Sequence, residues 1–183
     1  MEMKNSKERF GVVAQLLHWG IFVIFVALYV VAEMMEDAPK GPEKYALYDL
    51  HKSLGVSVLF LAFARLSWRM ANPLPEPEGK VSRLIETGAK VSHFLLYGVM
   101  FLMPLSGYVM SVTGGHPVGF FGLFNLPMVP GKNHDLHEAF EDVHEVTAEA
   151  ILVLVGVHLL AALWHHFVVK DNVFRRMLPV RLK

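Results

Sequence analysis

The sequence of 183 residues contains no cysteine. Disulfide bonds, iron–sulfur clusters and metal sites with thiolate ligands are therefore excluded for this chain. The chain also has no polar connection long enough to fold as a soluble domain, because its apolar segments use about half of its length. Acidic residues are scarce within those segments, so histidine is their main titratable residue type.

Four apolar stretches are each long enough to cross a bilayer as a helix. They cover approximately residues 11–32, 52–70, 92–112 and 146–169. The first follows a basic N-terminal stub, but it is too long for the apolar core of a signal peptide and has no A-x-A cleavage site. The sequence therefore predicts an all-α integral membrane four-helix bundle that forms a single domain over residues 1–183.

The formal net charge is zero, yet the charges are sorted along the chain. Basic residues gather in the N-terminal stub, in the 65–92 connection and in the C-terminal tail, whereas the other two loops are rich in Asp and Glu. These basic residues are Lys4, Lys7, Arg9, Arg65, Arg69, Lys80, Arg83, Lys90, Lys170, Arg175, Arg176, Arg181 and Lys183. The positive-inside rule then predicts that both termini are cytoplasmic. Nucleic-acid binding is not expected, because the basic segments alternate with membrane spans.

Four histidines form two pairs that match in their expected depth. His18 and His158 fall in the cytoplasmic half of the first and fourth spans, while His51 and His144 open the second and fourth spans from the outer side. Fourteen positions separate His144 from His158, which returns to nearly the same helical face with a rise of roughly 21 Å. A titratable side chain in hydrocarbon is costly and needs a partner or a function. Two facing imidazoles can fill both axial positions of a haem iron, an arrangement suited to electron transfer.

Two further interpretations of these histidines remain open from the residues alone. They could form hydrogen bonds across helices without binding anything. They could also bind zinc, although a tetrahedral zinc site needs its ligands clustered at one depth. The two expected depths favour paired haem ligands over both of these interpretations.

Three further residues are candidates for a quinone site. His93 opens the third span on the cytoplasmic side, and His165 lies seven residues beyond His158 on nearly the same face. With Lys170 they could bind a quinone carbonyl or carry its protons. Snorkelling of the lysine and headgroup contacts of the histidines are the alternative.

Additional features around the spans also have two interpretations. Arg65 and Arg69 share a helix face and could pair with haem propionates or mark the cytoplasmic boundary. Gly107 and the other glycines of the spans would let helices, or a flat porphyrin, approach closely. Residues 118–127 are apolar but too short to span, so we expect them to lie at the interface or to fold over the outer end of the bundle.

Motifs along the whole chain resemble those of one known family. They are Arg9-Phe10-Gly11, His18-Trp19, His51-Lys52-Ser53-Leu54-Gly55, Trp68-Arg69, His93 with Leu96-Tyr97, Met103-Pro104-Leu105-Ser106-Gly107-Tyr108, Phe120 to Phe124, His144, His158, His165-His166, Lys170-Asp171 and Arg175 to Pro179. In combination they resemble the bacterial cytochrome b561 family of small di-haem membrane proteins, which includes superoxide oxidase. The resemblance implies two b haems on the two histidine pairs, a ubiquinone site at the cytoplasmic end, and a multi-pass protein of the bacterial inner membrane.

The leading hypothesis for the function is therefore a superoxide oxidase. Superoxide on the periplasmic side would give one electron to the outer haem and leave as O2, and two such events would reduce ubiquinone at the opposite end. Superoxide is an anion, and Lys52, Lys40, Lys44 and Lys132 could form a local basic patch that attracts it, although the outer loops are mainly acidic.

Two competing hypotheses belong to different functional classes. The first is a quinone-linked cytochrome b that relays electrons to, or anchors, a periplasmic redox partner; an acidic, partly apolar outer face would suit docking. The second is a haem-free metal transporter that uses its transmembrane histidines, but the scarcity of acidic residues within the spans speaks against it.

Overall fold

The computed structural model describes residues 2–76, 82–128 and 131–178. Within these ranges the elements are α1 (Val12–Asp37), α2 (Pro42–Ala71), α3 (Arg83–Thr113), β1 (Gly119–Phe120), β2 (Phe124–Asn125), α4 (His134–Trp164), the π-helix η1 (His165–Val169) and the 3-10 helix η2 (Arg175–Met177). Lys80, Pro179, Arg181 and Lys183, which contribute to the sequence patterns above, lie outside the described residues.

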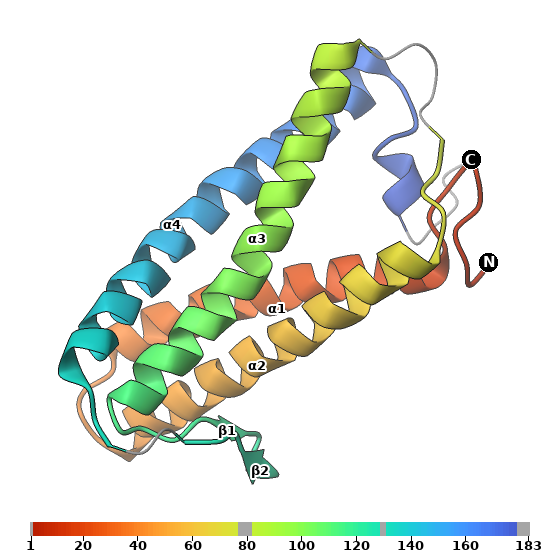
Figure 1. The fold of residues 1–183 in the computed structure, drawn as a ribbon. Coiled ribbons are helices and arrows are strands. Elements are labelled where there is room, and N and C mark those ends of the chain that lie inside the picture. Colours follow the sequence, from red (N-terminus) through yellow and green to blue (C-terminus); the bar gives the residue numbers. More distant parts are fainter. Residues whose placement is uncertain (1, 77–81, 129–130, 179–183) are drawn as a thin grey trace.

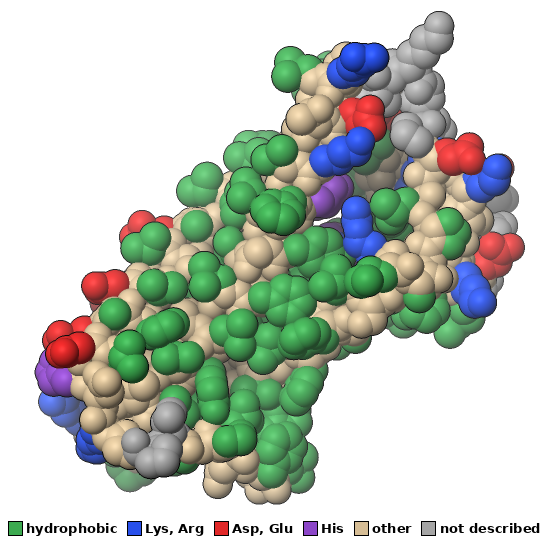
Figure 2. Space-filling model, in the orientation of Figure 1, with side chains coloured by type: hydrophobic (Ala, Val, Ile, Leu, Met, Phe, Trp, Pro, Cys, Tyr) green, Lys and Arg blue, Asp and Glu red, His purple; other side chains and the backbone are tan. Residues whose placement is uncertain are grey.

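Four of the described helices are long and apolar enough to cross a membrane. Only 11% to 22% of the residues in their most apolar windows are buried within the bundle, so most side chains of each helix are half-buried or exposed. Apolar side chains cover most of the visible face in Figure 2. A helix that is apolar on all sides and yet unburied needs an apolar solvent, and the predicted integral membrane four-helix bundle is confirmed.

The helices pack as two antiparallel pairs that are joined through α2 and α3 (Figure 1). Direct packing occurs between α1 and α2, between α2 and α3, and between α3 and α4, whereas α4 makes no comparable contact with α1 or α2. We call the end that carries β1 and β2 the hairpin end, and the end that carries the N-terminal segment and η2 the terminal end (Figure 1). Two helix pairs, α1 with α4 and α2 with α4, are therefore neighbours in the bundle without packing on each other.

The helices extend beyond the predicted apolar stretches. The second begins at Pro42 rather than near residue 52, and the fourth begins at His134 rather than near residue 146. Local signals explain both starts, because proline is favoured at the first helical position and the Asn133 side chain accepts a hydrogen bond from the Leu136 N–H at 3.1 Å. Hydropathy marks where a helix enters lipid, not where it starts. His51 and His144 consequently lie inside helices instead of at their first residues.

The apolar segment 118–127 folds over the hairpin end, one of the two places expected for it. Its short β-hairpin packs on α2, and Val118 joins Val56 and Val112 in a buried cluster. The connecting turn holds Phe121 and Gly122 at positive φ. The buried Ser53 hydroxyl lies 2.8 Å from the Asp49 carbonyl oxygen and accepts the Phe121 N–H at 3.0 Å, which ties the turn to α2.

Chain segments that are distant in the sequence are joined by hydrogen bonds at the terminal end. The buried Gln15 side chain donates to the Arg176 carbonyl oxygen at 3.2 Å, and the Trp19 indole N–H donates to that of Met177 at 2.9 Å. Arg9 donates to the Leu178 carbonyl oxygen at 3.1 Å. The segment after α4 is thus bound to the start of α1, across a pair of helices that do not pack on each other.

Replacing Ser53 with alanine should destabilise the fold by about 1–3 kcal/mol, because the Phe121 N–H would lose its acceptor in a half-buried hydrogen bond. The measurement is the midpoint of thermal unfolding of the purified protein in mild detergent. Ser57→Ala is the matched control, since that hydroxyl bonds only to the Ser53 carbonyl oxygen one turn earlier. Equal midpoints for the two variants would contradict the tie between the hairpin and α2.

Candidate functional site

The structure brings together both histidine pairs that were expected from depth. The ring centroids of His18 on α1 and His158 on α4 are 6.2 Å apart, near the terminal end. Those of His51 on α2 and His144 on α4 are 6.3 Å apart, near the hairpin end. Each pair therefore spans two helices that do not pack directly on each other.

The spacing within each pair fits two ligands on opposite sides of one metal ion. An imidazole nitrogen binds a transition metal at about 2 Å, and the ring centre lies about 1 Å farther away, which places two such centres ~6 Å apart. A haem also needs room for a flat ring, and Gly55 offers it one turn from His51, because a Cβ at Gly55 would meet no atom within 4 Å. The residues present therefore fit haem iron held between paired imidazoles.

Hydrogen bonds fix the orientation of one imidazole. His144 Nδ1 lies 3.1 Å from the Met103 carbonyl oxygen and 3.2 Å from Ser106 Oγ, both on α3. A carbonyl oxygen only accepts, so Nδ1 carries the proton and Nε2 keeps its lone pair for a ligand. Gly107 makes room for this ring, because a Cβ there would lie 2.8 Å from His144 Cε1.

Interhelical hydrogen bonding and a zinc site account less well for these histidines. His18 and His51 are buried at Nδ1 without a hydrogen-bond partner among the described residues, so hydrogen bonding at that atom does not explain their burial. A zinc site fits no better, because no group of three or more His, Asp or Glu side chains among the described residues could hold a metal ion.

A third imidazole and two guanidinium groups surround the pair at the terminal end. His93 on α3 lies beside His158, with ring centroids 5.7 Å apart, a contact that the sequence did not reveal. Nearby, the guanidinium carbons of Arg65 and Arg69 lie 5.8 and 5.7 Å from the centre of the Tyr97 ring. Figure 2 shows a hollow at this end in which a histidine and a basic side chain are visible. Neither arginine forms an ion pair with a described carboxylate.

His165 and Lys170 lie where α4 changes its winding. His165 begins the π-helix η1, and Lys170 ends it in the left-handed conformation, with φ at 59°. That conformation costs about 1–2 kcal/mol for a residue other than glycine. The side chain of Asp171, a residue for which the sequence predicted no role, lies 2.5 Å from His165 Nδ1. A second cavity, of about 260 Å³, is lined by His166, Phe167, Lys170, Asp171 and Arg175.

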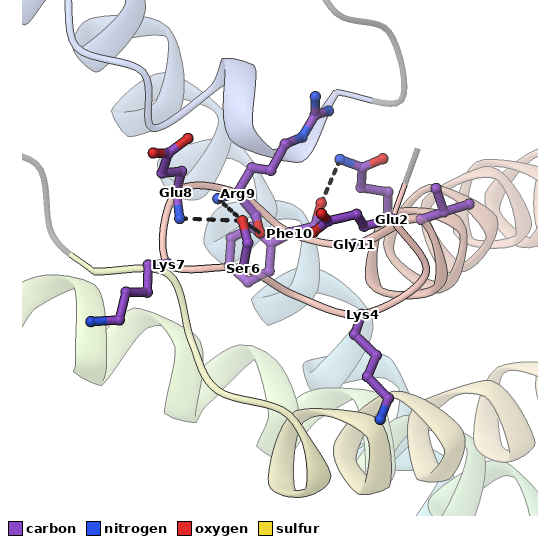
Figure 3. Close-up of a pocket in the computed structure, with 10 residues that line it drawn as sticks. Glu2, Lys4, Ser6, Lys7, Glu8, Arg9, Phe10 and Gly11 are labelled. Atoms are coloured by element: carbon purple, nitrogen blue, oxygen red, sulfur yellow. Dashed lines mark hydrogen bonds between the residues drawn. The ribbon is translucent and has the colours of Figure 1, made fainter.

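Another cavity lies away from the histidines. It has a volume of about 300 Å³ and is lined by residues of the N-terminal segment and the start of α1. Figure 3 shows that Lys4, Lys7 and Glu8 point away from one another instead of toward a common centre. None of the paired histidines lines it, and we assign it no ligand.

A membrane-spanning bundle whose facing helices present paired imidazoles is a membrane protein built to hold a cofactor in its core. Its particular kind follows from comparison with known proteins. The chain belongs to the prokaryotic cytochrome b561 family, whose sequence profile matches residues 9–180. Membership implies haem b binding and electron transfer, and the chain is a multi-pass bacterial membrane protein.

Individual relatives are similar over nearly the whole chain. Cytochrome b561 homolog 2 of Escherichia coli (strain K12) is 31% identical over 188 residues, which cover 97% of this chain and 95% of that protein. Cytochrome b561 homolog 1 of the same organism is 32% identical over 177 residues, covering 94% and 98%. The probable superoxide oxidase CybB of Yersinia pestis is 29% identical over 163 residues, covering 89% and 92%.

Replacing Gly107 with alanine should lower the haem bound per polypeptide by up to about half, because the new methyl group would displace the His144 ring in a close-packed site. The measurement is haem content by the reduced pyridine spectrum, per mole of purified chain. Gly88→Ala is the control, since a Cβ at that position of α3 would meet no atom within 4 Å. Equal haem content in the two variants would contradict the expectation that displacing the His144 ring weakens haem binding.

Proposed function

We propose that the chain is a superoxide:ubiquinone oxidoreductase of the bacterial inner membrane, folded as one di-haem domain over residues 1–183. The observation that carries the proposal is the presence of two imidazole pairs at two depths, each with the spacing of axial ligands. In this arrangement both termini are cytoplasmic, in keeping with the positive-inside rule, and the hairpin end faces the periplasm. A relative named as a probable superoxide oxidase supports this choice of donor.

The four histidines would hold the two haems. His51 and His144 would bind the iron of the outer haem, and His18 and His158 that of the inner haem. When bound, the haems would supply one-electron transfer between the two ends of the bundle. With both axial positions filled by protein, each pair would block direct binding of oxygen to the iron.

The hairpin end would receive superoxide. Lys52 follows His51 in α2, and its ammonium group donates to the Pro117 carbonyl oxygen at 3.0 Å. The Lys132 side chain lies against Gly115, two residues away from Pro117. Two lysine side chains thus lie at the 115–117 turn, and one of them directly follows the outer ligand His51 in the chain. They would attract an anion to a face whose loops are mainly acidic.

The terminal end would hold the acidic groups of the inner haem and the quinone. Arg65 and Arg69 lack carboxylate partners among the described side chains and would pair with haem propionates, which relieves the cost of cations in the span. His93, beside His158, would donate a hydrogen bond to a quinone carbonyl. His165 and Lys170 would supply protons to the quinone from the cytoplasmic side.

One observation favours a second candidate function. The β-hairpin exposes Phe121, Leu123 and Phe124, with 50%, 77% and 49% of their surfaces accessible. An apolar tip at the periplasmic end would suit docking of a redox partner to a quinone-linked cytochrome b. The two functions differ in whether superoxide alone can reduce the chain.

Removing a haem ligand should remove one haem. Alanine at His18, His158, His51 or His144 is expected to lower haem content from two to one per polypeptide, and the double variant within a pair should lose no more than either single variant. The measurement is haem content with the reduced-minus-oxidised spectrum. His134→Ala is the control, because His134 is exposed and bonded only to Glu138 one turn away. Loss of both haems in a His18/His158 double variant would contradict the pairing.

Purified protein without any partner should reduce a short-chain ubiquinone analogue when supplied with superoxide, and superoxide dismutase should abolish the reaction. Lys52→Glu should slow haem reduction by superoxide about tenfold at low salt, with a smaller difference at high salt. Lys52→Gln is the matched variant, since it removes the charge without reversing it and should lie in between. No reduction of the wild-type haem by superoxide would favour the partner-linked cytochrome, and an unchanged rate in Lys52→Glu would exclude steering by this lysine.

A further inference from the structure

The contact between His165 and Asp171 is the least expected ion pair in the described part of the chain. Their side chains are each only 18% exposed, and His165 Nδ1 lies 2.5 Å from Asp171 Oδ2. The second carboxylate oxygen of Asp171 accepts the Val173 N–H at 3.0 Å. Asp171 is therefore held from both sides, with one oxygen fixed by the backbone and the other by the imidazole.

An ordinary α-helix could not bring these two side chains together. Residues six positions apart point about 120° apart around the helix axis. Here the π-helix widens the last turn, and the Lys170 N–H bonds to the His165 carbonyl oxygen. The left-handed Lys170 then turns the chain back, so that Asp171 N lies 3.3 Å from the same oxygen. Two unfavourable features of the backbone combine to form one side-chain contact, as is common at functional sites.

Ending the helix does not account for the pair. A glycine at position 170 would allow the same turn without strain. A carboxylate near the C-terminal end of a helix is also unfavourable, because that end carries partial negative charge. Asp171 therefore depends on its interaction with the imidazole, and the imidazole gains an acceptor that fixes its tautomer.

We propose that Asp171 is a positioning residue that keeps the Nδ1 proton of His165 hydrogen-bonded and turns Nε2 toward the carbonyl oxygen of a bound quinone, so that the doubly protonated ring donates its Nε2 proton for the reduction. The inference rests on the quinone reduction of the proposed function. His165 follows His158 by seven residues on nearly the same face, roughly 10 Å nearer the terminal end. That position lies between the inner histidine pair and the water at the end of the bundle.

Reducing one quinone to quinol takes two electrons, which the donor would supply through the two haems, and two protons. The N–H bond at His165 Nε2 breaks, and its proton forms an O–H bond on the quinone. The Nδ1 proton stays hydrogen-bonded to Asp171 throughout the transfer. Water at the terminal end returns the proton to Nε2, and the second proton follows the same route.

The test starts from haem reduced with dithionite and follows its reoxidation by a short-chain ubiquinone analogue, using the detergent-purified full chain. Asp171→Asn should slow reoxidation about tenfold or more, and Asp171→Glu should recover part of the rate. His165→Gln should be at least as slow as Asp171→Asn. Because Asp171 acts through His165, the double variant should be no slower than His165→Gln. Asp142→Asn, an exposed carboxylate on α4 near the hairpin end, is the control and should match the wild type.

The remaining outcomes separate the possible failures. Unchanged reoxidation in Asp171→Asn, or a double variant slowed by the product of the two single effects, would overturn the role of Asp171 while leaving quinone reduction intact. Loss of the wild-type haem spectrum in Asp171→Asn would show a structural role and would also overturn it. A wild type that quinone cannot reoxidise would overturn the inference together with the quinone step. Failure of superoxide to reduce the wild type would affect only the donor, because this test does not use superoxide.

Discussion

The separation of α4 from α1 and α2 is the constraint on which the rest of the structure depends. Inside a bilayer, helices associate by close packing, and a bundle left to itself would close around its small residues. Here the imidazoles of α4 face those of α1 and α2 at about 6 Å, across helix pairs that do not pack together. The two halves of the bundle are joined by the contacts between α2 and α3, by the Tyr29 hydroxyl of α1, which donates to the Ala148 carbonyl oxygen of α4, and by the hydrogen bonds at the terminal end. A cofactor bound between the imidazoles would add contacts that the protein alone does not make.

The two ends of the bundle are held together by different contacts. At the hairpin end the β-hairpin packs on α2, and Gly107 lets α3 press against the His144 ring. The terminal end is held by hydrogen bonds from Gln15 and Trp19 to the segment after α4. Under the proposed function the closer packing at the hairpin end would suit a small donor, and the single chain segment at the terminal end would leave room for a larger ligand between helices. The difference agrees with a small donor at the first end and a quinone at the second.

Much of the fold was predictable from the sequence, because lipid imposes simple rules of length and hydropathy. The four spans and the matched depths of the histidines followed from those rules, which left two places open for residues 118–127, at the interface or over the outer end. The helix starts at Pro42 and His134 did not follow from them, since capping is independent of hydropathy. The proximity of His93 to His158 depends on how α3 turns about its own axis, which depth does not determine. The Asp171 contact could not be found by helical periodicity, because it exists only where the α-helix is interrupted.

The relatives divide between names that state only a cytochrome and one that states a probable superoxide oxidase, at nearly equal identity. Such a division is expected if the shared helices supply electron transfer and the short connections select the donor. In this chain the loops at the hairpin end carry Lys132 and the exposed aromatic tip of the β-hairpin. Lys52 lies nearby on α2. Charge there sets the rate at which an anion arrives, while the apolar tip sets whether a protein can dock. Under the proposed function the choice of donor would depend on a few side chains outside the helix core, and the same paired imidazoles would serve either donor.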